Sequence, residues 1–114
     1  MDPEENSEMK RSPKVARSSA PWKFRLYVNG KNSLKSIITQ QNLSEFCEKF
    51  LPGRCDVEVI DMAENFEMAR ADRIMALPTL VRREPLPMCK IIGDLSNTNQ
   101  VVTALGLHGS DAGD

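Results

Sequence analysis

Apolar and polar residues alternate in the first patterned segment of the chain. The apolar positions, spaced by two, are Trp22, Phe24, Leu26 and Val28. A period of two is typical of a strand with one buried face, so we predict a strand over 22–28. A second segment, Cys-Asp-Val-Glu-Val-Ile-Asp at 55–61, is rich in β-branched residues and predicts a second strand.

A helix is predicted between these two strands. Ser33 and Ser36 are both candidate N-caps. We place the start at Ser36 and the end near Leu51, because this choice gathers apolar side chains in one broad stripe, namely Ile37, Leu43, Phe46, Cys47 and Phe50. Leu34 and Ile38 fall outside this stripe.

Two further helices are predicted from weaker patterns. In residues 64–75, the apolar residues Phe66, Ala69 and Ile74 lie among charged ones, which predicts a shorter helix. A last helix is expected after Ser96, which would be its N-cap. Its inward side chains would be Val101, Val102 and Leu105.

A proline-rich hairpin is predicted between these two helices. Pro78 disfavours helical conformations in the residue before it, so the chain must turn there. Strands are expected at 79–81 and 90–92, on either side of Pro85 and Pro87. We interpret Pro78 as a turn-forming residue at the start of a strand, with a cis peptide bond as the alternative.

The predicted order of elements is β-α-β-α-β-β-α. The first three elements form a right-handed unit with parallel strands. The whole order is that of an α/β thioredoxin-like single domain, which we expect over 22–107. Residues 1–21 contain almost no large apolar side chains and predict a disordered N-terminal tail, and 108–114 predict a flexible C-terminal tail.

Composition gives no sign of nucleic acid or membrane binding. The formal net charge is −1 and the pI is about 5.9, without a basic cluster. No apolar run approaches the ~20 residues of a membrane helix, and the N-terminus has no apolar export region. We therefore expect a cytoplasmic protein with three free thiols, Cys47, Cys55 and Cys89. A regulatory disulfide between Cys55 and Cys89 is the alternative.

Catalytic patterns are missing from the sequence. A thioredoxin-like redox enzyme needs an attacking thiol at the start of the first helix, but the stretch 30–36 contains no sulfur. The single histidine, His108, lies in the predicted tail, and neither a phosphate-binding loop nor a metal-spaced His/Cys set occurs. We interpret Asp72 and Glu84 as solvated charges. The sequence therefore predicts a binding module without cofactor or metal, and no enzyme.

Four sequence blocks resemble the KaiB family of circadian clock proteins. They are L-Y-V-N-G at 26–30, L-P-G-R-C-D-V-E-V-I-D at 51–61, A-D-R-I-M-A-L-P-T-L-V-R-R at 71–83 and K-I-I-G-D-L-S-N at 90–97. They follow the family's order at nearly its spacing. The block that contains Gly93 and Asp94 is the most specific of the four.

The resemblance implies a non-catalytic interaction protein. KaiB proteins bind the ring-shaped ATPase KaiC, and in cyanobacteria the bound form recruits KaiA and displaces the histidine kinase SasA. Their resting form is a homo-oligomer, commonly a tetramer, whose C-terminal half is packed differently from the thioredoxin-like binding form. In that binding form Pro78 is expected to be cis. The implied partner is a KaiC-like ATPase in a circadian or stress-timing system, together with KaiA or a SasA-like kinase where present. A redox or stress-response protein that uses its free cysteines is the alternative.

Departures from the family pattern bear on this switch between two packings. Ala104 and Gly106 stand where cyanobacterial members have Gly and Asp. Alanine favours a helix over glycine by about 0.5 to 1 kcal/mol, and Gly106 can end that helix in the left-handed conformation. We therefore predict a bias towards the thioredoxin-like form. A tyrosine that those members carry after the last helix is absent here, which leaves a dimer as well as a tetramer open.

Five charged residues are carried over from the resemblance as candidate KaiC contacts. Lys35, Arg73 and Lys90 match basic positions of the family. Asp56 and Glu58 lie on the second predicted strand, an expected docking edge. The family often has Lys at the position of Glu58, so we expect a KaiC that differs from the cyanobacterial one.

Overall fold

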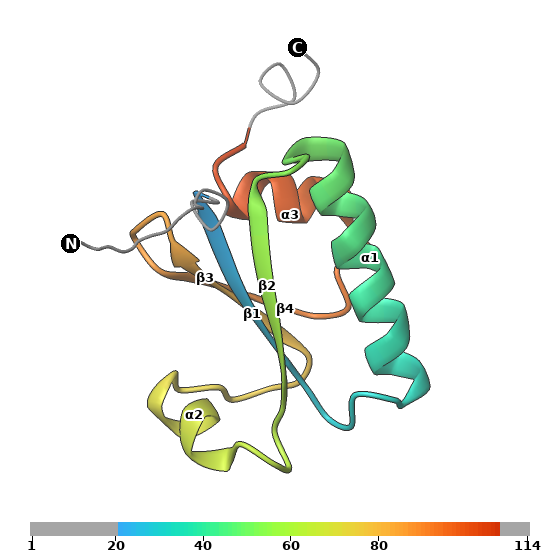
Figure 1. Ribbon diagram of the computed structural model, residues 1–114, viewed down its shortest axis with the longest axis vertical. Coiled ribbons are helices and arrows are strands. Elements are labelled where there is room, and N and C mark those ends of the chain that lie inside the picture. The colour runs from blue at the N-terminus through green and yellow to red at the C-terminus, as the bar shows by residue number, and fades with distance from the viewer. Residues whose placement is uncertain (1–20, 108–114) are drawn as a thin grey trace, which may run out of the picture.

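A four-stranded mixed sheet, in the order β2-β1-β3-β4, lies at the centre of the protein (Figure 1). The computed structural model describes residues 21–107. The strands are β1 (Trp22–Val28), β2 (Cys55–Asp61), β3 (Thr79–Glu84) and β4 (Cys89–Ile92). Strand β1 pairs with β2 in parallel and with β3 in antiparallel, and β4 adds to β3 in antiparallel. The predicted thioredoxin-like order is therefore confirmed. The predicted tails lie outside the described residues, apart from Pro21.

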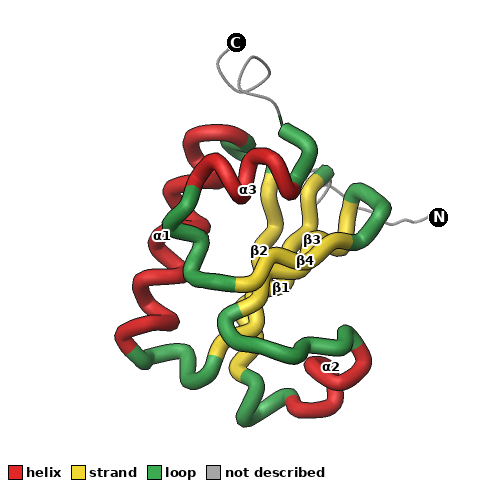
Figure 2. Tube along the Cα trace, turned by 180° about the vertical axis from the view of Figure 1, so that it is seen from behind, coloured by secondary structure: helices red, strands yellow, loops and turns green. Residues whose placement is uncertain are grey.

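Three helices cover the two faces of the sheet unequally. Figures 1 and 2 show α1 (Leu34–Phe50) and α3 (Thr98–Ala104) on one side and the short α2 (Phe66–Ala71) on the other. The larger core lies under α1 and α3 and contains the alternating apolar residues of β1. A smaller core lies under α2, and its buried residues are Tyr27, Ile60, Ala69, Ile74 and Val81. Among residues 21–107, none of the helices combines the length and apolar character that crossing a membrane requires.

The start of α1 differs from the prediction. Ser33 is the N-cap, since its Oγ accepts a hydrogen bond from the backbone N–H of Ser36, with an N···O distance of 3.3 Å. Ser36 is instead buried, together with Thr39, whose hydroxyl donates to the Lys35 carbonyl at 2.8 Å. Because these two small polar side chains face the sheet, the helix is rotated from the predicted stripe. Ile37 is consequently 40% exposed, so its predicted place in the core is wrong.

Helix α2 is shorter than predicted and ends at Ala71. Phe66 is 57% exposed, whereas Ala69 and Ile74 are buried. Arg73 has a positive φ of 58°, a conformation that no helical residue adopts, so the helix cannot continue to Met75.

The C-terminal segments follow the predicted pattern with small shifts. Asn97, and not Ser96, caps α3, because its side chain accepts a hydrogen bond from the Gln100 N–H at 3.1 Å. After the helix, Gly106 has a φ of 76°, as predicted for a left-handed end. The Leu77–Pro78 peptide bond is cis, and the Pro78 carbonyl accepts a hydrogen bond from the Gly93 N–H at 2.9 Å.

Candidate interaction surface

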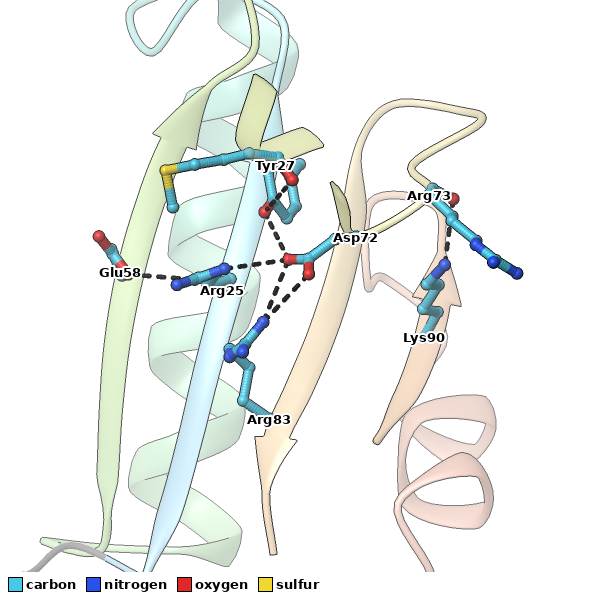
Figure 3. Close-up of polar contacts among 8 residues, drawn as sticks. Arg25, Tyr27, Glu58, Asp72, Arg73, Arg83 and Lys90 are labelled. Atoms are coloured by element: carbon cyan, nitrogen blue, oxygen red, sulfur yellow. Dashed lines mark hydrogen bonds and ion pairs between the residues drawn. The ribbon is translucent and has the colours of Figure 1, made fainter. Parts of the chain in front are cut away.

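Asp72 lies at the centre of a polar cluster on the α2 face of the sheet (Figure 3). Its carboxylate accepts hydrogen bonds from the Tyr27 hydroxyl and from Arg25 Nη1, at 2.5 Å and 3.1 Å. Arg83 Nη1 donates to the other carboxylate oxygen at 3.1 Å. The side chain of Asp72 is only 8% exposed. We call Arg25, Tyr27, Asp72 and Arg83 the Asp72 cluster.

The cluster corrects the interpretation of Asp72 as a solvated charge. Strand alternation places Arg25 and Tyr27 on the sheet face opposite Leu26, and the chain after α2 brings Asp72 onto that face. The donors come from β1 and β3, so the sequence next to Asp72 carries no sign of them. Glu84, in contrast, is exposed as expected.

Electrostatic interactions within the cluster favour an ionised Asp72 and a neutral Tyr27. Burial would raise the pKa of the Asp72 carboxyl, but the hydrogen bonds from Tyr27 and Arg25 and the charge of Arg83 outweigh it and leave the pKa below its ordinary value. Burial, together with the hydrogen bond to Asp72, raises the pKa of Tyr27 to about 12. A carboxylate and a neutral phenol are therefore stable together at neutral pH. The cluster fixes α2 to the sheet, and Arg25 and Arg83 also line a hollow of about 350 Å³ that extends to Asp56 and Glu58 on β2.

Two of the predicted partner-binding residues meet at the β4 edge of the sheet. Lys90 Nζ donates to the Arg73 carbonyl oxygen at 3.0 Å, which joins β4 to the chain after α2 (Figure 3). Two residues beyond each of them stands an exposed apolar side chain, with Met75 92% and Ile92 61% exposed. We call Arg73, Met75, Lys90 and Ile92 the β4-edge surface.

The other three predicted partner-binding residues lie elsewhere. Asp56 and Glu58 are exposed on β2, the opposite outer strand, where Glu58 accepts a hydrogen bond from Arg25 Nε at 3.3 Å. Lys35 is exposed in the first turn of α1. Hydrogen bonds from Ser96 and the nearby charge of Lys35 lower the pKa of Asp94. The five residues therefore occupy three regions and form no single patch.

The start of α1 carries hydroxyls in place of thiols. Ser33 Oγ donates to Ser36 Oγ at 2.8 Å beside a hollow of about 250 Å³ that Leu77 and Pro78 also line. No histidine lies among residues 21–107, so no imidazole base activates these hydroxyls in that part of the chain. This position therefore lacks the thiol that a thioredoxin-like redox site has at the start of its first helix.

The predicted alternative of a disulfide between Cys55 and Cys89 is wrong. Cys55 begins β2 and Cys89 begins β4, and two strands lie between them. Three strand spacings amount to roughly 14 Å, whereas a disulfide spans Cα atoms less than about 7 Å apart. Cys89 lies near α3, where its Sγ is 3.9 Å from the Ala104 carbonyl oxygen.

Residues 25–107 match the sequence model of the KaiB domain. The chain belongs to the KaiB family. It is 39% identical over 84 residues to the circadian clock protein KaiB3 of Synechocystis, which covers 74% of this chain and 81% of the relative. It is 41% identical over 86 residues to the circadian clock oscillator protein KaiB of Microcystis aeruginosa, with 74% and 80% of the two chains covered.

Solved structures show the same fold at lower sequence identity. The N-terminal domain of SasA from Synechococcus elongatus matches with a TM-score of 0.63 and 20% identity, over 91% of this chain and 97% of that domain. Mitochondrial thioredoxin 3 of Saccharomyces cerevisiae matches with a TM-score of 0.60 and 16% identity, over 80% and 83% of the chains. This KaiB-family chain therefore has the thioredoxin-like architecture.

Sequence reasoning missed Arg82 as well as the Asp72 cluster. Arg82 is buried, its Nη1 and Nη2 donate to the carbonyls of Leu105 and Pro87 at 3.0 Å and 2.9 Å, and its guanidinium lies 5.1 Å from the Trp22 ring centre. A signal was available in this case. The period of two in β3 places Arg82 on the same face as Leu80, and an arginine at a core position needs buried acceptors.

Proposed function

We propose that this KaiB-family protein binds a KaiC-type ATPase ring and modulates its ATPase and phosphorylation cycle in a circadian or stress-timing system. The family match over residues 25–107 supports the proposal most directly, because it includes nearly the whole described fold. The start of α1 contains no sulfur, which disfavours the competing hypothesis of a thioredoxin-like dithiol site at this position.

The β4-edge surface is the proposed contact with KaiC. An outer strand presents unpaired backbone groups, and Met75 and Ile92 add exposed apolar area beside two cations. Protein interfaces combine such an apolar centre with charged groups at the rim, and the charges contribute mainly to association rate and specificity. The resemblance of Arg73 and Lys90 to basic positions of the family points to the same edge.

The β2 edge and the start of α1 are proposed as separate contacts. Asp56 and Glu58 present negative charge on β2, the edge strand at the opposite end of the strand order from β4. A second protein could therefore bind there while KaiC occupies the β4 edge. KaiA is the implied candidate. A SasA-like kinase would compete for KaiC, since its N-terminal domain has the same fold. A homo-oligomeric resting state with a repacked C-terminal half belongs to the same proposal.

Binding to a KaiC-type ATPase tests the proposal. The full chain is mixed with the ATPase and ATP, and complex formation is followed by size-exclusion chromatography. We expect a complex with the native chain and at least a tenfold weaker one with the double variant Arg73→Glu, Lys90→Glu. Lys49→Glu, an exposed cation on the far end of α1, is the matched control and should leave binding unchanged. No complex with the native chain, or equal loss in the control, would contradict the proposal.

Replacing the three cysteines distinguishes KaiC binding from the alternative, a redox function that depends on the thiols. A variant with all three cysteines replaced by serine should still bind the ATPase, because none of the thiols belongs to the β4-edge surface. Loss of binding in this variant, with the fold intact by circular dichroism, would favour a thiol-dependent function.

A further inference from the structure

Cys47 and Cys55 lie beside each other where α1 joins β2. Cys47 is in the last turn of α1, Cys55 is the first residue of β2, and only residues 51–54 lie between the two elements. The turn is held by hydrogen bonds from the Leu51 N–H to the Cys47 carbonyl at 2.8 Å and from the Arg54 N–H to the Leu51 carbonyl at 3.0 Å. A short, ordered connection therefore fixes the position of one thiol relative to the other.

The two thiols share an environment as well as a turn. Both are half-buried, and both line a cavity of about 380 Å³ between α1 and β2. The Cys55 thiol donates to the carbonyl oxygen of Leu51, in the turn between the two elements, at 3.9 Å. Leu26, Leu43 and Val59 contribute apolar walls to this cavity. The Cys89 thiol is not among the residues that line it, so two of the three cysteines are set apart from the third.

The environment gives the two sulfur atoms different acidities. The neighbouring Cys47 thiol, together with the positive charge of Arg54, lowers the pKa of the Cys55 thiol. The neighbouring Cys55 thiol and burial raise the pKa of the Cys47 thiol. The thiolate is the nucleophile in thiol–disulfide exchange, so Cys55 is suited to attack first and Cys47 to react second.

We propose that Cys47 and Cys55 form an oxidisable dithiol, which a low-molecular-weight disulfide such as oxidised glutathione converts into an intramolecular disulfide. The Cys55 thiolate attacks one glutathione sulfur, so that a mixed disulfide forms and one glutathione thiolate leaves. Cys47 then loses its proton, attacks the Cys55 sulfur and releases the second glutathione. The protein dithiol loses two electrons and two protons, and the oxidised glutathione is reduced to two thiols.

The bond would tie the last turn of α1 to the first residue of an outer strand. Closing it requires the sulfur atoms to approach to about 2.0 Å, and the adjoining cavity offers space for the two side chains to rotate. The linkage adjoins Asp56 and Glu58 on β2, so oxidation would stiffen the end of the sheet that carries them. This inference is independent of KaiC binding, because the β4-edge surface lies at the opposite edge of the sheet from β2.

Peptide mapping of the native chain tests the pair directly. The full-length protein is incubated with excess oxidised glutathione, free thiols are blocked, and the digest is analysed by mass spectrometry without reduction. We expect one product that has lost two hydrogen atoms and links the peptides of Cys47 and Cys55, with Cys89 blocked as a free thiol. Unmodified thiols, a stable glutathione adduct on either cysteine, or linkage through Cys89 or between two chains would overturn the proposal.

Single variants then test the order of the two steps. In Cys47→Ser the attack can occur but the resolution cannot, so glutathione should accumulate on Cys55. In Cys55→Ser we expect at least tenfold slower modification of Cys47, and in Cys89→Ser the rate of disulfide formation should equal that of the native chain. Circular dichroism checks that each variant is folded. Faster modification of Cys47 than of Cys55 would contradict the assigned order of attack. If a variant fails to fold, the peptide mapping of the native chain still tests the disulfide itself.

Discussion

The two faces of the central sheet are stabilised in different ways. Under α1 and α3, the side chains of β1 and β3 enter a continuous apolar core that includes Leu26 and Leu80. Under α2 the apolar cluster is small, and the neighbouring residues of the same strands are bonded to a buried carboxylate. Alternate residues of one strand therefore contribute apolar packing on one face and charged hydrogen bonds on the other. We expect a cavity under α1 and α3 to lower the free energy of unfolding most, and the loss of a charge under α2 to lower it less.

Truncating Leu26 should have the largest effect on stability. Leu26 is fully buried at the centre of the larger core, so Leu26→Ala removes apolar contacts and leaves a cavity. We expect a loss of about 2–5 kcal/mol in the free energy of unfolding. Urea denaturation followed by the fluorescence of Trp22, the single tryptophan, measures it. Leu34→Ala, at a position that is 75% exposed, is the control and should change stability by less than about 0.5 kcal/mol. Similar losses in both variants would refute the contrast between buried and exposed positions.

Neutralising Asp72 should destabilise the other face. Asp72→Asn leaves Arg25, Tyr27 and Arg83 without their carboxylate, and we expect a loss of about 1–3 kcal/mol, less than for a fully buried pair because both arginines reach solvent. The folded-state pKa of Asp72 is lowered, so its contribution is present above the unfolded value of about 3.9 and is lost as the pH falls further. The difference between native and variant proteins should therefore shrink below about pH 4. Asp56→Asn, at an exposed carboxylate, should show neither effect.

The phenol of Tyr27 reports on the same cluster independently. It is the single tyrosine of the chain, so tyrosinate absorbance follows it alone. The native midpoint should lie near the raised pKa of about 12, and Asp72→Asn should move it towards the ordinary value of about 10, because the neighbouring negative charge is gone. Since the folded-state pKa is raised, the contribution of Tyr27 to stability is lost as the pH rises through this range. An unchanged midpoint in a folded variant would mean that Asp72 does not contribute to the raised pKa of Tyr27.

The same contrast explains how much the sequence could predict. The period of two identified the apolar face of β1, and the order of elements gave the fold, because both depend on local pattern. The start of α1 was misplaced because two buried residues on its inner side are polar and have no apolar signature. The Ser36 hydroxyl accepts from the N-cap residue Ser33, and the Thr39 hydroxyl donates to a carbonyl within the helix. The Asp72 cluster depends on residues more than ten positions away in sequence, so only the tertiary structure brings its members together.

Arg82 is a charged residue on the apolar face of the sheet, so its side chain combines both kinds of stabilisation. Arg82→Lys keeps the charge but loses the fork that reaches the carbonyls of Leu105 and Pro87 and the planar group that lies over Trp22. We expect a loss of about 1–2 kcal/mol. Amide exchange should increase most in α3, which this side chain holds at its C-terminal end. Arg70→Lys, on the exposed side of α2, should leave that exchange unchanged. Uniform acceleration across the sheet would mean that Arg82 stabilises the whole fold and not α3 in particular.

The smallest effect is expected at the start of α1, the helix that covers the apolar face. Ser33→Ala removes the acceptor for the Ser36 N–H and should cost about 1 kcal/mol, with faster amide exchange confined to the first turn. Ser44→Ala, at an exposed position inside the helix, should be neutral or slightly stabilising, because alanine is the better helix former. If Ser44→Ala cost as much as Ser33→Ala, the cap would be irrelevant to where α1 begins. A loss confined to Ser33→Ala would show that this hydroxyl determines where α1 begins.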